Sequence, residues 1–140
     1  MAMRPDEFVR FFHEQRASAI LRTDNRERAG QAMDAALAGG FRVVEFTLTI
    51  PGAIDLIGEF AERPGVVVGA GTVLTEDDAR AAVEAGASFL VSPVTDEAVI
   101  DAAKSLGVAA MPGASTPTEM WRAHRAGAQL IKLFPSPDGL

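Results

Sequence analysis

The chain has 140 residues, 48% of them hydrophobic, which is enough for one domain with a buried core. No apolar stretch approaches the roughly 18 residues needed to cross a bilayer, and a net charge of −6 argues against nucleic acid, so neither a membrane nor nucleic acid is expected as a partner. The absence of cysteine excludes disulfides and thiolate metal sites and fits a cytoplasmic protein.

The first element expected in chain order is a helix. Phe8, Phe11 and Phe12 recur at helical spacing, which indicates one apolar face. We therefore expect residues 1–17 to form an N-terminal packing helix that closes one end of the fold.

After this helix, short apolar runs alternate with alanine-rich amphipathic segments. The predicted strands are Ser18–Arg22, Arg42–Thr47, Val66–Gly69, Ser88–Ser92, Val108–Met111 and Leu130–Phe134, and the predicted helices are Arg26–Ala38, Ile54–Ala61, Glu76–Ala85, Glu97–Leu106 and Thr118–Ala126. Apolar strands that alternate with helices indicate a parallel sheet covered by helices. The order predicts a single α/β domain over residues 1–140, with no helix after the sixth strand.

The connecting segments contain residues typical of helix ends. Gly39, Gly86 and Gly127 follow predicted helices, where glycine commonly terminates the last turn. The segment 116–119 reads Thr-Pro-Thr-Glu, which is the sequence pattern of a capping box. Each predicted helix therefore begins soon after the carboxyl end of a strand.

Lys132 is the most informative residue. It lies in the apolar run Leu130–Phe134, which predicts a buried strand. Because burying an ammonium group is unfavourable, we expect this lysine to have a pKa below its usual value of about 10.4 and to act as a neutral amine that can form a Schiff base with a carbonyl group. A strand-end lysine that extends to solvent is the alternative for this residue taken alone.

Glu45 is a carboxylate within the apolar strand Arg42–Thr47. Such a group must be paired with a cation, or its pKa rises. Either environment suits a general acid/base beside an amine nucleophile. A structural ion pair with Arg22 or Lys132 is the alternative, and pairing with Lys132 is compatible with catalysis.

A glycine-containing segment, Gly69–Thr72, follows the third predicted strand. Glycine allows the backbone to approach a ligand closely, and Thr72 adds a hydroxyl at what we expect to be a helix entrance. The segment lacks the Gly-Lys-Ser/Thr ending of a phosphate-binding loop. It suits a small carboxylate better than a phosphate, and a simple tight turn is the alternative.

Other reaction classes have weaker support. His13 and His124 have no partner at metal-ligand spacing, and no serine lies in a nucleophile-elbow pattern. Trp121 is expected to pack on a helix face. The remaining polar groups lie where strands end, and in parallel α/β folds such groups meet at one edge of the sheet.

Five phrases of the sequence together resemble the KDPG (2-keto-3-deoxy-6-phosphogluconate) and 4-hydroxy-2-oxoglutarate aldolase family. In order along the chain, they are Val43-Val44-Glu45-Phe46-Thr47-Leu48-Thr49, Val68-Gly69-Ala70-Gly71-Thr72-Val73-Leu74, Leu90-Val91-Ser92-Pro93, Met111-Pro112-Gly113-Ala114-Ser115-Thr116 and Ile131-Lys132-Leu133-Phe134-Pro135. The resemblance implies a TIM-type (β/α)8 barrel and a class I aldolase that uses no metal or other cofactor. Lys132 matches the Schiff-base lysine, and Glu45 matches the general acid/base.

The same resemblance implies the residues that bind a small keto-acid substrate. They are Gly71 and Thr72 for the pyruvate carboxylate, Pro93 and Phe134 for apolar walls, and Arg22 for a substrate anion. Family members commonly form trimers, so a homo-oligomer is expected by analogy.

The sequence departs from the family pattern in two respects. Thr49 stands where we would expect an arginine in members that act on the phosphorylated gluconate substrate, so the aldehyde partner is open. The chain also stops just past the sixth predicted strand, so we expect a barrel truncated there, whose first and sixth strands are edges.

The main functional prediction is a Schiff-base aldolase that reversibly cleaves a 2-keto-3-deoxy sugar acid, phosphorylated or not, or 4-hydroxy-2-oxoglutarate. The products would be pyruvate and an aldehyde. The alternatives are a non-catalytic barrel fragment that serves as an assembly or binding unit, and a phosphate-binding isomerase or synthase barrel in which Lys132 is not a nucleophile.

Overall fold

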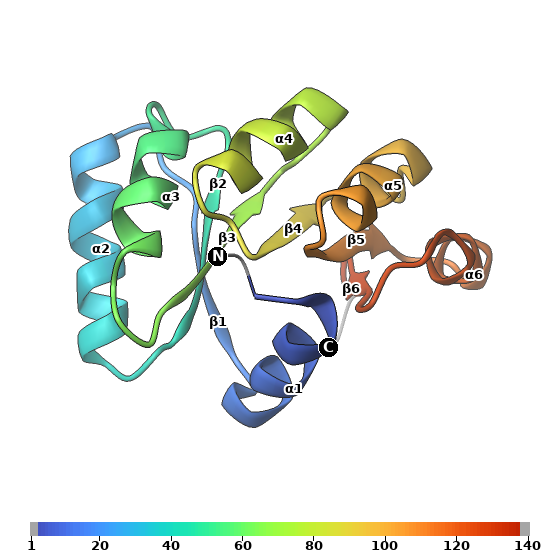
Figure 1. The fold of residues 1–140 in the computed structure, drawn as a ribbon, viewed down its shortest axis with the longest axis horizontal. Helices are drawn as coiled ribbons and strands as arrows, with labels where there is room; N and C mark the ends of the chain where they lie inside the picture. Colours follow the sequence, from blue (N-terminus) through green and yellow to red (C-terminus); the bar gives the residue numbers. More distant parts are fainter. Residues whose placement is uncertain (1–2, 138–140) are drawn as a thin grey trace.

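A computed structural model describes residues 3–137 as one curved parallel sheet with helices packed against it (Figure 1). The helices are α1 (Pro5–Gln15), α2 (Arg26–Ala38), α3 (Ala53–Ala61), α4 (Glu76–Glu84), α5 (Glu97–Ser105) and α6 (Pro117–Ala126). The strands are β1 (Ser18–Leu21), β2 (Val43–Thr47), β3 (Val67–Gly71), β4 (Phe89–Ser92), β5 (Ala109–Ala114) and β6 (Lys132–Leu133). Within this part of the chain, no helix has both the length and the apolar character that crossing a membrane requires.

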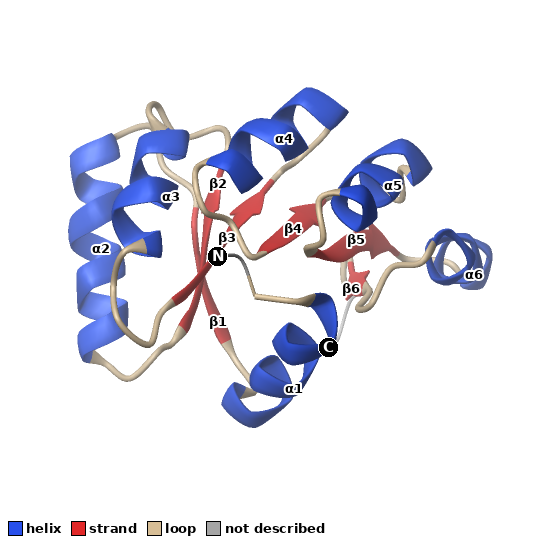
Figure 2. Cartoon of the chain, in the orientation of Figure 1, coloured by secondary structure: helices blue, strands red, loops and turns tan. Residues whose placement is uncertain are grey.

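The six strands lie side by side in chain order, and each pairs in parallel with the next. Figure 2 shows them as a curved series with α2 to α6 around the outside, which is the arrangement of a half-barrel. This confirms the predicted α/β fold and parallel order. Because the strands are parallel, all their carboxyl ends lie along one edge.

Side chains of the strands alternate between two apolar cores. On the outer face, Val44 and Phe46 of β2 pack with Leu56 and Ile57 of α3 and with the other covering helices. On the inner face, Val43, Val67 and Phe89 form a second cluster with α1. β2, β3 and β4 are therefore buried on both faces, which explains why their sequences are nearly continuous apolar runs.

Helix α1 fills the end of the inner face opposite to the strands' carboxyl ends. Phe8 is fully buried, and its ring stacks on Phe89 of β4 with a centroid distance of 4.5 Å. Phe12 stacks on Phe8 at 5.6 Å. These phenylalanines therefore form a packing face on α1, which spans Pro5–Gln15 of the expected 1–17; residues 1 and 2 lie outside the described residues.

The helix ends follow the chemistry expected from the sequence. In the capping box of α6, the Thr116 backbone N–H donates to Glu119 Oε2 at 2.9 Å and the Glu119 N–H donates to Thr116 Oγ1 at 3.2 Å. At the other end of α6, Gly127 has a φ of 104°, a left-handed conformation that glycine adopts without steric cost.

Three predicted strands differ from the observed ones by more than one residue at an end. β3 continues through Gly71, so the alternative of a tight turn from Gly69 is wrong, and β5 continues through Ala114. The predicted buried strand Leu130–Phe134 is wrong in length and burial: β6 has two residues, with Lys132 half-buried and Leu133 exposed. Among residues 3–137, β6 pairs only with β5, so one side and part of its surface have no cover.

The packing of α1 can be tested with Phe8→Ala. Removing a fully buried aromatic ring should lower the free energy of unfolding by about 3–5 kcal/mol, measured by urea denaturation. Phe41→Ala is the matched control, since Phe41 is 38% exposed and its loss should change the stability by less than about 1 kcal/mol. Equal losses for the two variants would show that α1 does not anchor the inner face.

Candidate active site

A cavity of about 340 Å³ lies on the inner face, where the strands reach their carboxyl ends. It is bounded mainly by residues that the sequence singled out. Those lining residues are Arg22, Glu45, Thr72, Pro93, Lys132 and Phe134. Gly71, the remaining predicted site residue, does not line the cavity and lies directly behind Glu45.

The parallel sheet brings these side chains together from distant parts of the sequence. Arg22, Thr72 and Pro93 each follow the last residue of a strand, β1, β3 and β4 respectively. Glu45 points inward from the middle of β2, and Lys132 begins β6. Their convergence follows from the rule that parallel strands end at a common edge.

Glu45 is the most buried ionisable group of the cavity, with an exposed fraction of 2%. Burial raises its pKa above the ordinary 4.5, and the positive charges of Lys132 and Arg22 counteract part of that rise. Among the described residues, no side chain forms a hydrogen bond or close ion pair with its carboxyl group. The alternative of a structural ion pair with Arg22 or Lys132 is therefore not observed as a direct contact.

Lys132 reaches the cavity from the edge of the sheet. Its Cα pairs with Gly113 of β5, and its Nζ lies 5.0 Å from the centre of the Phe134 ring. A cation over an aromatic face is held by the ring quadrupole. The amine is thus directed along the apolar wall that Phe134 forms, and it shares the cavity with Glu45.

Thr72 and Arg22 form a polar contact across the mouth of the cavity. Arg22 Nη2 donates a hydrogen bond of 2.8 Å to Thr72 Oγ1. Thr72 has a φ of 58°, a strained value for a β-branched residue, and such strain is common where a side chain must take a defined direction. The expected helix entrance is wrong, because α4 begins at Glu76 and Thr75 caps it.

Hydrogen bonds to β4 hold in place the loop that follows β3 and contains Thr72. The Val73 N–H donates to the Val91 carbonyl at 3.1 Å, and buried Ser92 Oγ donates to the Val73 carbonyl at 2.8 Å. The next loop is attached similarly, since Thr95 Oγ1 donates to the Gly113 carbonyl at 2.9 Å. Thr72 therefore lies between the end of β3 at Gly71 and the hydrogen-bonded Val73, and both neighbours fix its position.

Four cavity residues lie outside the predicted set: Ile20, Thr47, Val91 and Ser92. Ile20 lies two residues before Arg22, and Thr47 lies two residues after Glu45. Alternate residues of a strand share one face, so this spacing could have identified both. Thr47 Oγ1 also lies 2.8 Å from Thr49 Oγ1 at the position where an arginine was expected.

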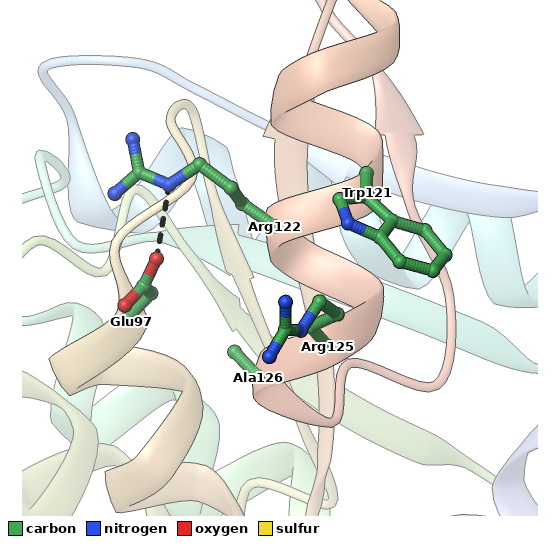
Figure 3. Close-up of a pocket in the computed structure, with 5 residues that line it drawn as sticks. All are labelled: Glu97, Trp121, Arg122, Arg125 and Ala126. Atoms are coloured by element: carbon green, nitrogen blue, oxygen red, sulfur yellow. Dashed lines mark hydrogen bonds and ion pairs between the residues drawn. The ribbon is translucent and has the colours of Figure 1, made fainter.

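A second cavity, of about 310 Å³, lies between α5 and α6 and contains none of the predicted site residues (Figure 3). Arg122 Nε extends toward Glu97 at 3.0 Å, while the Trp121 ring extends away from that pair. The prediction that Trp121 packs on the fold is wrong, because this residue is 60% exposed.

The curved parallel sheet, its helical cover and the cavity at the strands' carboxyl ends place the chain in the class of β/α-barrel proteins, here as a half-barrel. The family described as KDPG and KHG aldolase matches residues 10–138. The chain belongs to this family.

Similar proteins share both the sequence and the fold. The chain is 36% identical to a probable 2-dehydro-3-deoxy-6-phosphogalactonate aldolase of Rhizobium meliloti over 128 residues, which cover 87% of this chain and 60% of that protein. A solved 4-hydroxy-2-oxoglutarate/2-dehydro-3-deoxyphosphogluconate aldolase has a TM-score of 0.80 and 34% identity, covering 96% of this chain and 65% of that one.

A third similar protein is the KDPG aldolase of Legionella pneumophila, solved with pyruvate captured as a covalent carbinolamine. Its TM-score is 0.76 at 29% identity, and the match covers 84% of this chain and 58% of that one. The chain therefore spans less than two thirds of the length of each of these proteins.

The raised pKa of Glu45 predicts how stability depends on pH. A carboxyl whose folded pKa exceeds its unfolded value stabilises the fold at low pH and loses that contribution as pH rises through the folded pKa. Glu45→Gln should therefore resemble the parent near pH 4 and become progressively more stable than the parent as pH rises, measured by thermal unfolding.

Glu119→Gln provides a control of opposite sign. Hydrogen bonds from the Ser115 backbone and from Thr116 lower the pKa of Glu119, so the parent should gain stability over this variant as pH rises. If Glu45→Gln followed the same direction as Glu119→Gln, the cations near Glu45 would outweigh its burial.

Proposed function

We propose that the chain carries the chemistry of a class I aldolase, with Lys132 as the nucleophile and Glu45 as the acid/base. The observation that carries this proposal is that Lys132 and Glu45 line the same cavity. Family membership supports it, because the similar proteins are named as aldolases. The Legionella protein was solved with pyruvate captured as a covalent carbinolamine.

In the proposed reaction, the neutral Lys132 amine attacks the ketone carbon of a 2-oxo acid and forms a carbinolamine. Loss of water then gives a protonated Schiff base at C2, which accepts the electron pair released when the bond between C3 and the hydroxyl-bearing C4 breaks. The aldehyde leaves and an enamine of pyruvate stays on Lys132. Protonation and hydrolysis of the enamine release pyruvate and restore the amine.

Glu45 suits the proton transfers in these steps. Because its pKa is raised by burial, the carboxyl can hold or release a proton closer to neutral pH than an exposed glutamate. The Glu45 side chain is also 2% exposed and lines the cavity. We propose that it protonates the leaving hydroxyl of the carbinolamine and removes the proton of the substrate hydroxyl during cleavage.

The keto-acid carboxylate would bind between Thr72 and Arg22. Arg22 occupies one lone pair of Thr72 Oγ1, so the threonine proton is free to be donated to an oxygen in the cavity. The apolar walls formed by Pro93 and Phe134 suit the methyl side of pyruvate. Thr49 adds a neutral hydroxyl beside the cavity residue Thr47, 2.8 Å from its Oγ1.

A second candidate function is an assembly or binding unit, favoured by the edges of the sheet. β1 and β6 each have one strand neighbour in the described part of the chain, and Leu133 and Phe134 are 39% and 42% exposed. Exposed strand edges and apolar groups are surfaces on which further strands or subunits assemble. We propose a homo-oligomer, a trimer by analogy with the family.

The nucleophile can be tested by borohydride reduction in the presence of pyruvate. Reduction of a Schiff base should leave one carboxyethyl group on Lys132, detected by peptide mass spectrometry. Lys104 is the matched control, because it is the other lysine of the sequence and lies exposed on α5. An unmodified Lys132 in a folded sample of defined oligomeric size would favour the assembly function instead.

The acid/base role predicts a separate effect of Glu45→Gln. Exchange of the pyruvate methyl protons with deuterated water requires the enamine, and it can be followed by proton NMR. Glu45→Gln should slow this exchange by about 10²–10⁴-fold, the typical contribution of general acid–base catalysis. Exchange at the parent rate would assign the proton transfers to another group.

A further inference from the structure

Strand β3 has two glycines on its inner face, and backbone conformation does not require either of them. Gly69 and Gly71 both lie within the extended strand Val67–Gly71, and neither has a positive φ. A glycine inside a strand weakens it, so its presence commonly marks a place where another group approaches closely. A close neighbour is therefore expected above each glycine.

The space above Gly71 is occupied by the Glu45 carboxyl group. A Cβ placed on Gly71 would overlap Glu45 Oε1 and would lie 2.8 Å from Cδ and 3.1 Å from Cγ. Rotating the carboxylate about its last bond would leave the overlap with Cδ. Relief of this overlap therefore requires the whole carboxyl group to move, and the space open to it is the cavity that Glu45 lines.

The space above Gly69 is occupied from the opposite side. A Cβ there would lie 2.5 Å from Cε1 and Cε2 of Phe89, the ring on which Phe8 of α1 stacks. Glu45 pairs with Gly69 in the strand register, and Gly71 pairs with Thr47. Because Phe89 fills the place beside Gly69, the Glu45 side chain leans diagonally toward the carboxyl end of β3 and over Gly71.

We infer that Gly71 is a positioning residue: because it has no side chain, it leaves the space that the Glu45 carboxyl group occupies. This role differs from binding the substrate carboxylate through the backbone, which the family resemblance implies for the same segment. The steric part of the inference stands on the packing of β2 against β3. Its catalytic consequence rests on the function proposed above.

Two consequences follow for the variant Gly71→Ala. The added methyl group displaces the carboxyl away from β3 and into the cavity, nearer to Arg22 and Lys132 and to solvent. Both changes lower the pKa of Glu45 toward its ordinary value, because burial is the main cause that raises it. The displacement also moves the carboxyl from the position at which it would exchange protons with a substrate on Lys132.

A double-mutant cycle on this chain tests the steric part. Gly71→Ala should lower the melting temperature by about 5 °C or more in the parent, as expected for an overpacked core. In the Glu45→Ala background, which lacks the clashing atoms, the same change should shift the melting temperature by less than about 2 °C. In the Glu45→Gln background, which keeps the volume but removes the charge, the loss should persist.

Gly69→Ala is the matched control for the cycle. Its methyl group would meet Phe89 and not Glu45, so its cost should be the same in the parent and in the Glu45→Ala background. Additive losses for Gly71→Ala and Glu45→Ala, like those expected for the Gly69 control, would overturn the inference.

A titration distinguishes positioning from packing alone. With carboxyl-¹³C-labelled glutamate, the Glu45 resonance is the one that Glu45→Gln removes. We expect its pKa to move down in Gly71→Ala and to stay raised in Gly69→Ala. An unchanged pKa in Gly71→Ala would overturn the positioning role.

Pyruvate trapping on the same variants separates this inference from the proposed function. If the parent traps pyruvate, Gly71→Ala should slow the methyl-proton exchange at least about 10-fold more than Gly69→Ala does. If the parent forms no adduct on Lys132, the proposed function fails. The double-mutant cycle and the titration of Glu45 still decide whether Gly71 positions the Glu45 carboxyl group.

Discussion

A carboxyl group enclosed by apolar strands is the constraint on which the rest of the site depends. Glu45 cannot be buried without either keeping its proton or gaining nearby positive charge. The fold partly does both, since burial raises the pKa while Lys132 and Arg22 limit the rise. A group balanced in this way changes its protonation readily when the charge beside it changes.

The inner face of the sheet has two regions along the strands, one apolar and one polar. Near the amino ends, Phe8 and Phe89 fill the interior and exclude water. Near the carboxyl ends, the side chains become polar and surround the cavity. β3 lies beneath the boundary between these regions, and its glycines leave room for a ring from β4 and a carboxylate from β2.

Burial is lowest at the two edge strands. β2, β3 and β4 are covered on both faces, whereas β1 and β6 are only partly buried. Lys132 and Arg22 belong to these less covered edges, so both cations of the site lie where the described part of the sheet has no further strand. The chain spans less than two thirds of the length of the similar proteins that it matches.

Much of the fold and of the site could be predicted from the sequence, because parallel strands with helical connections impose one chain order and one common edge. The bounds of α2 and the capping of α6 follow from local residue chemistry, and six of the seven predicted site residues line one cavity. Local patterns could not show that β6 is short and half-exposed, since burial depends on which neighbours cover a strand. They also could not show that Gly71 serves Glu45, because that contact joins two strands whose register and side-chain direction only tertiary packing decides.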